Sequence, residues 1–421
     1  MCGHVRGHVR PGAATCGAGH RNYSAAAIIV LADMRPVSNP IPAVRLPTHV
    51  SVQAGRVAFA VPGDLATPTG GYRYNRRIIE ELRRLGWRVD VLDLGDGFPF
   101  PSAARRAAAL AILSAAPCGC PIIVDGLAFG ALPEAGALQS RTPLIALVHQ
   151  PLATESSLDT AQADIFRRSE RAALAAAARV VVTSEATGRI VIADYGVQRR
   201  RVSVVRPGND TVAPACGSND GVVRLLSVGS VVPDKGYDLL IAAVAGITDL
   251  PWRLTIAGDR TRNLAATARL DADISAQGLE DKVAVLGAVS PERVFELCLV
   301  SDLFVLASRF EGYGMALAEA VAHGLPVVST TAGAIPDTVP AGTGLLVPPN
   351  DATALMEALR RLIGDRDERQ RLAANASIAA AQLPSWQESA RLFAGAIAAV
   401  DESRTDIRRP AAHRLLTTAG L

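Results

Sequence analysis

Short apolar runs alternate with longer amphipathic stretches along most of the chain, beginning at Arg56. The apolar runs are rich in β-branched residues, and the stretches between them, such as 74–86 and 160–178, have helical patterns. This alternation is typical of βα units that build a parallel sheet. The expected strands of this first half are 56–63, 88–94, 121–126, 143–149, 179–184 and 201–208.

A break in the pattern separates this half from a second one. Residues 210–221 combine Pro, Gly, Ser and Asn, as linkers do. The alternation then resumes, so the sequence predicts an α/β protein with two Rossmann-like domains, 51–215 and 222–384. Ligands of open parallel sheets bind beyond the carboxyl ends of the strands, so we expect one interdomain cleft. The expected strands of the second half are 223–230, 253–259, 283–287, 303–308, 326–330 and 344–349.

The first 50 residues differ from the rest of the chain. They hold four of the seven histidines and show little periodicity. We interpret residues 1–50 as a disordered leader or as a misassigned start, with Met34 as the alternative start. A signal peptide and a histidine-rich metal site are less consistent with this composition.

Composition limits the classes of function. Apolar residues make up 49% and charged residues 20% of the chain, which is typical of a globular protein, and the net charge of +3 gives no indication of nucleic-acid binding. Six cysteines without a disulfide-dense or zinc-type spacing favour the cytoplasm. Residues 51–215 carry 19 arginines against 15 acids. This excess allows an anionic acceptor or a peripheral place at the inner membrane, but a compositional bias toward arginine explains it better.

Two glutamates lie at an otherwise apolar helix. The expected helix 315–323 contains Glu319, and Glu311 lies just before its glycine-rich entry. The unpaired N–H groups and the dipole of a helix N-terminus favour an anion such as phosphate. The alternatives are an ion pair between Glu319 and His323 and a solvated loop position for Glu311.

Three further positions follow expected strands. Lys235 is one of only two lysines and follows a βα turn, where a compact cation suits a phosphate; a surface role is the alternative. Gly70 and Gly71 permit close approach of backbone before a helix, although a plain turn explains them better. His149 ends a strand, where a structural histidine is the common alternative.

Several other classes of site are disfavoured. No GxGxxG motif follows the first strand of either half, and there is no P-loop. Asp271 and Asp273 fall on a polar helix and are expected to be solvated. The sequence therefore predicts no metal site and no bound cofactor.

The order and spacing of these motifs resemble family 4 of the retaining glycosyltransferases, which have the GT-B fold. The resemblance extends from residue 56 to about 400 and is carried by FEGYGM and EAVAHGLPVVST, with Glu311 and Glu319 eight positions apart, and by SVVRPGND, IAGD and VAVLGAV. It implies that 385–401 is a terminal helix that returns to the first domain, with 402–421 as a flexible tail.

The resemblance also implies roles in the second domain. Glu319 would hold the ribose hydroxyls of a nucleotide sugar. Lys235 and the amides of Gly314 and Met315 would neutralise its diphosphate. Glu311 would bind hydroxyls of the donor sugar near the reacting carbon.

The resemblance also implies roles for residues that surround the diphosphate and the donor sugar. Backbone from Val285 to Gly287 would contact the base, the amide of Gly71, beside Gly70, would complete the phosphate site, and His149 would face the donor sugar. Tyr313 belongs to the same glycine-rich entry. One departure is Ser230, because many members have arginine there; Lys235 or Arg309 would then supply the missing charge.

The implied function is transfer of a sugar from a nucleoside diphosphate sugar, with UDP as the first expectation, to an unidentified glycan, lipid or small-molecule acceptor. The transfer would proceed with retention and without a metal. The open alternatives are another GT-B nucleotide-sugar enzyme, such as an epimerase, and an inactive nucleotide-sugar-binding protein.

Overall fold

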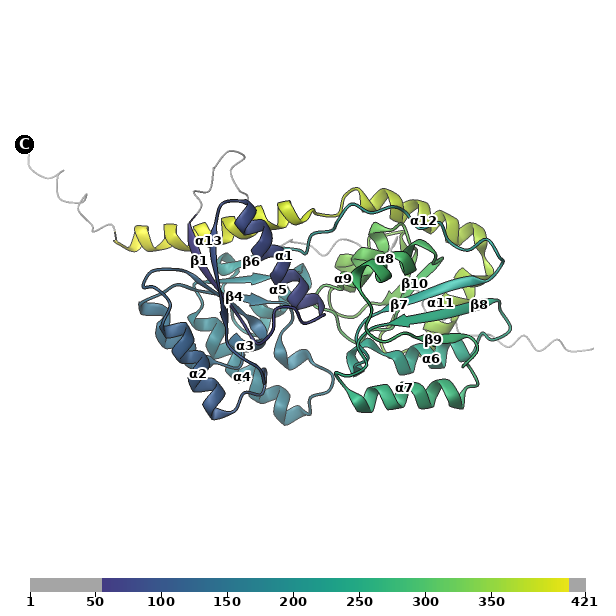
Figure 1. Ribbon diagram of the computed structural model, residues 1–421, viewed down its shortest axis with the longest axis horizontal. Coiled ribbons are helices and arrows are strands. Elements are labelled where there is room, and N and C mark those ends of the chain that lie inside the picture. Colours follow the sequence, from purple (N-terminus) through teal and green to yellow (C-terminus); the bar gives the residue numbers. More distant parts are fainter. Residues whose placement is uncertain (1–54, 409–421) are drawn as a thin grey trace, which may run out of the picture.

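The computed structural model describes residues 55–408, with side chains from 55 to 400. Two α/β domains lie side by side (Figure 1). The predictions for residues 1–50 and for the end of the tail lie outside the described residues. The helix expected at 385–401 continues to Arg408, so that the beginning of the predicted tail is helical.

The first domain is built on a six-stranded sheet in which every pairing is parallel, with the order β2-β1-β3-β4-β5-β6. The order reverses at β1, and such a reversal is where open α/β sheets bind ligands. The strands are β1 (Arg56–Val61), β2 (Arg88–Asp93), β3 (Ile122–Asp125), β4 (Leu144–Val148), β5 (Arg179–Val182) and β6 (Val202–Val204).

The helices of this domain connect its strands. They are α1 (Gly70–Arg84), α2 (Ala103–Ser114), α3 (Gly126–Phe129), α4 (Thr160–Ala176) and α5 (Glu185–Ala193), with short 3-10 helices η2 (Pro133–Ser140), η3 (Leu152–Thr154) and η4 (Arg199–Arg201). Helix α1 begins four positions before the expected start at 74. Thr69 caps it, because its hydroxyl accepts from the Tyr72 amide, so Gly70 and Gly71 form the first turn instead of a preceding loop.

The second domain repeats this architecture with the strand order β12-β11-β10-β7-β8-β9. Its pairings are also parallel, and the order reverses between β10 and β7. The strands are β7 (Val223–Val228), β8 (Trp252–Ala257), β9 (Val283–Val285), β10 (Leu303–Leu306), β11 (Val327–Thr330) and β12 (Gly344–Val347).

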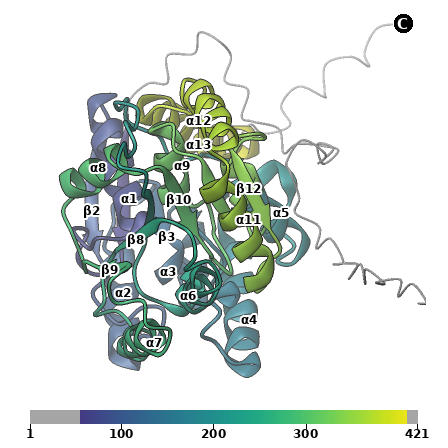
Figure 2. The ribbon, with the colours of Figure 1, turned by 90° about the vertical axis from the view of Figure 1, so that its right-hand side faces the viewer.

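The second domain contains the remaining helices. Helix α9 covers Met315–Ala322, one residue shorter than expected. In Figure 2 this domain faces the viewer, with α6 and α11 on one side of the sheet and α8 on the other. The others are η5 (Pro233–Lys235), α6 (Tyr237–Ala245), α7 (Leu264–Ala276), α8 (Pro291–Leu299), α10 (Ile335–Thr338), α11 (Ala352–Gly364), α12 (Arg366–Ala380) and α13 (Trp386–Arg408).

Each sheet is buried on both faces, which explains the nearly continuous apolar runs of its strands. Successive residues of β10 point to opposite sides: Leu303 and Val305 join a core with α6, α7 and α11, whereas Phe304 and Leu306 join one with α8 and α9. Both domains thus have three layers.

Helix α13 belongs to the core of the first domain although it follows the second in sequence. Trp386, Phe393 and Ile397 pack in one cluster with Phe59 of β1 and Ile78 of α1. The helix runs back along the first domain in Figure 1, so the chain crosses twice between the domains.

Candidate functional site

The centre of the site lies where the second sheet reverses its order. The turn after β7 carries Lys235 and the loop after β10 carries Glu311, and Lys235 Nζ lies 2.5 Å from Glu311 Oε1. Ser308 donates a hydrogen bond of 2.7 Å to the same oxygen. Only 9% of the Glu311 side chain and 24% of that of Lys235 are exposed. The structure therefore places an ion pair with restricted solvent access at the expected ligand position.

Helix α9 starts beside this ion pair. Gly314 precedes it with φ of +88°, a left-handed conformation that favours glycine, and provides no side chain to cap the helix. The first N–H groups of α9 thus retain their capacity to bind an anion. Residues 311–314 are held by the backbone, since the Glu311 carbonyl accepts from the Ala334 amide at 2.8 Å.

The first turn of α1 lies against the same region from the other domain. A Cβ built on Gly70 would lie 3.5 Å from Met315 Sδ, and one on Gly71 would lie 3.3 Å from His149 Cδ2. Gly312 lies even closer to the first domain, because a Cβ there would lie 2.0 Å from the His149 carbonyl oxygen. The amino ends of α1 and α9 therefore meet beside His149.

His149 is held in a buried polar network of the first domain. Its Nε2 lies 3.1 Å from Asn75 Oδ1 and 3.3 Å from Asp125 Oδ2, and Asn75 Nδ2 donates to Asp125 at 2.6 Å. Burial raises the pKa of Asp125, but the hydrogen bond and charge of His149 and hydrogen bonds from Asn75 and the Leu127 amide bring it below its ordinary value. The ionised carboxylate thus orients the imidazole.

Glu319 pairs across the domains rather than along its own helix. Its Oε1 contacts an Nη atom of Arg73 on α1. The alternative pairing with His323 is not formed, because His323 Nδ1 lies 2.8 Å from the Ala213 carbonyl oxygen. Burial lowers the pKa of His323.

The other expected donor residues surround this centre. Ser230 follows the end of β7, its carbonyl accepts from the Val232 amide, and it is partly exposed. Tyr313 is buried, and its pKa is raised by burial. Val285 ends the edge strand β9, and the Gly287 carbonyl accepts from the Gly258 amide, so this backbone borders β8.

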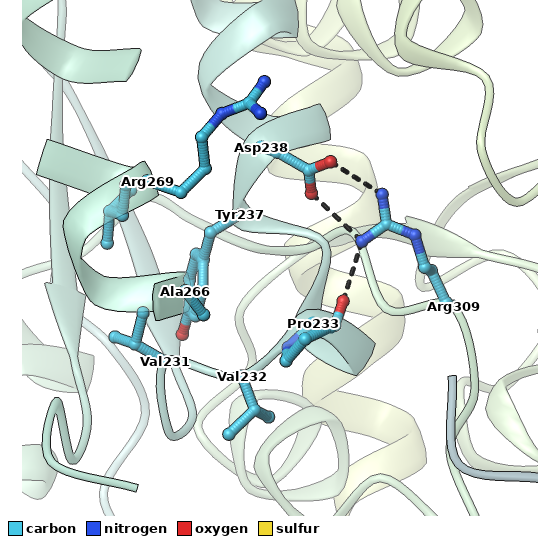
Figure 3. A pocket seen from close by; sticks show the side chains of 9 residues that line it. Val231, Val232, Pro233, Tyr237, Asp238, Ala266, Arg269 and Arg309 are labelled. Carbon is cyan, nitrogen blue, oxygen red and sulfur yellow. Dashed lines mark hydrogen bonds and ion pairs between the residues drawn. The ribbon is translucent and has the colours of Figure 1, made fainter. Parts of the chain in front are cut away.

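Arg309, the alternative source of the charge missing at Ser230, is paired with Asp238. Its guanidinium binds both oxygens of Asp238, at 3.0 and 2.7 Å, and the Pro233 carbonyl (Figure 3). This contact forms one wall of a hollow of about 160 Å³, and Arg309 is the one residue of its lining that was expected at the site. The contribution of Arg309 to a diphosphate stays a prediction, and it requires Arg309 to bind phosphate beside Asp238 or to leave it. The hollow is lined by Val231, Val232, Pro233, Tyr237, Asp238, Ala266, Arg269, Leu270 and Arg309.

A pair of carboxyl groups joins the domains next to Lys235. Asp234 Oδ1 accepts from the Ser156 amide of the first domain at 2.8 Å. Burial, the charge of Asp234 and a hydrogen bond with Asp234 raise the pKa of Glu155 to about 7, against opposing effects of Arg262 and Lys235. When two carboxyl groups are in contact, the repulsion between their charges favours the state in which one of them is protonated.

Within the described side chains, no cluster of three His, Cys, Asp or Glu residues could hold a metal ion. The helices in the described part of the chain also include none with the length and hydropathy needed to span a bilayer.

The sequence interpretation did not single out Arg73, Asn75, Asp125, Glu155 or Asp234. Asp125 had a usable signal, since it ends a buried strand on the edge where ligands bind. Arg73 and Asn75 had none, because an arginine-rich amphipathic helix does not reveal which polar residue faces the other domain.

Two family profiles match adjoining parts of the chain. Residues 211–378 match "Glycosyl transferases group 1" and residues 121–212 match "Glycosyltransferase Family 4". Together they extend over more than half of the chain. They meet at the linker between the two domains, so each profile corresponds to one half of the fold.

Curated relatives match over part of their length. A D-inositol 3-phosphate glycosyltransferase of Nocardia farcinica is 30% identical over 59% of this chain and 60% of that protein. A mannosylfructose-phosphate synthase of Agrobacterium fabrum is 31% identical over 37% of this chain and 38% of its own. The chain thus spans between about a third and two thirds of the length of these relatives.

Solved structures share the fold over most of the chain. Sucrose-phosphate synthase from Thermosynechococcus elongatus has a TM-score of 0.71 at 21% identity, covering 83% of this chain and all of that one. HepE of Anabaena, in complex with UDP and glucose, has a TM-score of 0.64 at 20% identity, covering 81% and 98%. With its two parallel sheets and both matching profiles, the chain belongs to the group 1 and family 4 glycosyltransferases of GT-B fold.

Proposed function

We propose that this protein is a retaining glycosyltransferase that moves a sugar from a nucleoside diphosphate sugar to an acceptor hydroxyl. The observation that carries the proposal is the Lys235–Glu311 ion pair beside the uncapped start of α9. It combines a cation and free amides for a diphosphate with a carboxylate that can accept hydrogen bonds from sugar hydroxyls. Family membership supports the same activity.

The leaving group accounts for the arrangement of charges. When the bond from the sugar to the diphosphate breaks, negative charge develops on the departing oxygen, and stabilising that charge is the main electrostatic task. Lys235 and the amides of Gly314 and Met315 perform it, with the amide of Gly71 added from the first domain. Glu319 holds the ribose, and the backbone from Val285 to Gly287 borders the base.

The proposed retention rests on the resemblance to the retaining family and assigns roles to two groups near the reacting carbon. Glu311 binds hydroxyls of the sugar, and His149 faces it from the first domain. The departing phosphate oxygen takes the proton of the acceptor hydroxyl as the new bond forms on the same face. Contacts between the domains exclude water and limit hydrolysis of the donor.

The first experiment is a thermal-shift screen with UDP, GDP and ADP and their sugars. UDP leads because HepE, which shares the fold, binds UDP and glucose. A ligand at about 100 times its Kd stabilises a protein by about 2.7 kcal/mol. We expect Glu319→Ala to abolish the shift, Lys235→Ala to reduce it, and Glu311→Ala to lower turnover more than binding. The anomeric configuration of the product, read by NMR, tests retention.

A nucleotide-sugar-binding protein without transfer activity is the second candidate. Ser230 favours it, because a cation is missing there and Arg309 is engaged by Asp238. Binding of a donor without transfer or hydrolysis in the presence of varied acceptors would support this candidate over the first.

A further inference from the structure

Arg73 and Glu319 form an ion pair that connects the two domains. Arg73 lies in the first turns of α1 and Glu319 in the middle of α9, 246 positions apart in sequence. The side chains are only partly exposed, 36% for Arg73 and 25% for Glu319. An ion pair with this burial is screened less than one at the surface.

A second carboxylate lies within reach of the same guanidinium. Arg73 Nη2 lies 3.9 Å from Asp210 Oδ2. Asp210 follows β6 at the passage to the second domain and is bound by Arg77, with contacts of 2.6 and 3.2 Å. Burial lowers the pKa of Arg73, Asp210 raises it, and Arg77 and Arg76 lower it. The guanidinium stays charged, so the nearby carboxylates determine where it pairs and not whether it is protonated.

The pairing occupies a group that the proposed function requires. A ribose binds a carboxylate through hydroxyl donors, and Arg73 already holds Oε1 of Glu319. Vicinal ribose hydroxyls that bind both oxygens of Glu319 therefore compete with Arg73 for Oε1. Asp210 offers Arg73 a carboxylate on its own side of the interface.

Resting on the proposed function, we propose that Arg73 is a positioning residue that holds Glu319 in the donor-free protein and moves to Asp210 when ribose hydroxyls bind Glu319. Arg73 thereby weakens donor binding, because its ion pair with Glu319 must open. Occupation of the donor site then also changes the contact between the domains. If a ligand binds only one of two arrangements, its apparent affinity is its intrinsic affinity multiplied by the fraction of the protein in that arrangement.

The test is isothermal titration of UDP, GDP and ADP into wild type, Arg73→Met, Arg73→Lys and Arg84→Met. For the nucleotide that binds wild type, we expect Arg73→Met to bind about fivefold more tightly, because Glu319 no longer needs release. Arg73→Lys keeps the charge and should remain near wild type. Arg84 is the matched control, since it lies at the far end of α1 and pairs with Glu81.

A second variant measures the transfer to Asp210. Asp210→Asn removes the alternative partner of Arg73. When Arg73 is present, we expect this substitution to weaken nucleotide binding about two- to fivefold. In the Arg73→Met background we expect it to change nothing. The absence of an effect in that background separates this role from a general disturbance of the linker.

Three results overturn the inference. Weaker binding by Arg73→Met makes Arg73 a direct donor ligand, and unchanged binding removes its role. If no nucleotide binds wild type or Arg73→Met, the proposed function fails together with this inference. A different result rejects the inference alone: the wild type binds a nucleotide, Glu319→Ala abolishes that binding, and Arg73→Met leaves it unchanged or weakens it. Thermal melts of each variant confirm folding before titration.

Discussion

Lys235 Nζ lies 2.5 Å from Glu311 Oε1, although the two residues are 76 positions apart. One follows β7 and the other follows β10, which are neighbours at the reversal of strand order in the second sheet. Both side chains have restricted access to solvent, with 24% of Lys235 and 9% of Glu311 exposed. In the proposed function, Lys235 is the cation that binds phosphate and Glu311 is the carboxylate that binds the sugar, and the two are in direct contact.

Replacing Lys235 by methionine should weaken binding of the nucleoside diphosphate about tenfold or more. The variant removes one charge-assisted hydrogen bond to phosphate, typically worth about 1.5–3 kcal/mol, and leaves Glu311 without its partner. Isothermal titration measures the change. Lys282→Met is the matched control, because Lys282 is the other lysine and binds the Thr248 and Leu250 carbonyls beside Trp252. Equal losses in both variants would remove Lys235 from the donor site.

Asp125→Asn should reduce kcat about 10- to 100-fold and change the KM for the donor less. Asp125 orients His149 and Asn75 through contacts of 3.3 and 2.6 Å, so its neutral replacement leaves the imidazole less fixed, and small displacements cost large factors in rate. Steady-state kinetics over a range of pH separate this effect from unfolding. The control is Asp194→Asn, an exposed carboxylate at the end of α5. An unchanged kcat in Asp125→Asn would show that His149 needs no orienting partner.

The sequence predicted the fold better than it predicted the pairings of the site. Alternating apolar runs predicted two parallel sheets, because strands buried on both faces leave a strong local signal. Lys235 and His149 were identified because they follow strands, and carboxyl ends of parallel strands meet at one edge, whereas Glu311 was identified because it precedes the glycine-rich start of a helix. The pairing of Glu319 with Arg73 depends on how two domains meet, and no local pattern records that. The pairing of Arg309 with Asp238 lies within the second domain, and it too left no local pattern in the sequence.

Stability should decline as the pH rises from about 4.5 to 8, with the steepest change at about pH 6, between the unfolded and folded pKa values of Glu155. The raised pKa of Glu155, about 7 in the folded protein, means that its stabilising contribution is fully present below the ordinary carboxyl pKa of 4.5. It is lost as the pH rises through 7, because two carboxylates then face each other across the domains. Glu170, whose pKa burial also raises to about 7, adds to the decline in the same range.

Differential scanning calorimetry of Glu155→Gln isolates the interdomain part of this decline. Glutamine keeps a neutral hydrogen-bonding group beside Asp234, so Tm should fall less between pH 5 and 8 than in wild type. Glu80→Gln, at an exposed position of α1, should leave the profile unchanged. Identical profiles for wild type and Glu155→Gln would attribute the decline to Glu170.

Gly312→Ala should separate the domains and abolish transfer while leaving each domain folded. A Cβ at this position would lie 2.0 Å from the His149 carbonyl oxygen and 2.9 Å from its carbon, and both are backbone atoms that no rotamer change can move. We expect a loss of about 1–3 kcal/mol in stability, as for other overpacked sites. Small-angle scattering should show a larger radius of gyration. Gly364→Ala is the matched control, because no atom lies within 4 Å of a Cβ there. Alanine there, at the last residue of α11, should preserve transfer and slightly raise Tm. A compact, fully active Gly312→Ala variant would show that the contact between Gly312 and His149 is not needed for the reaction.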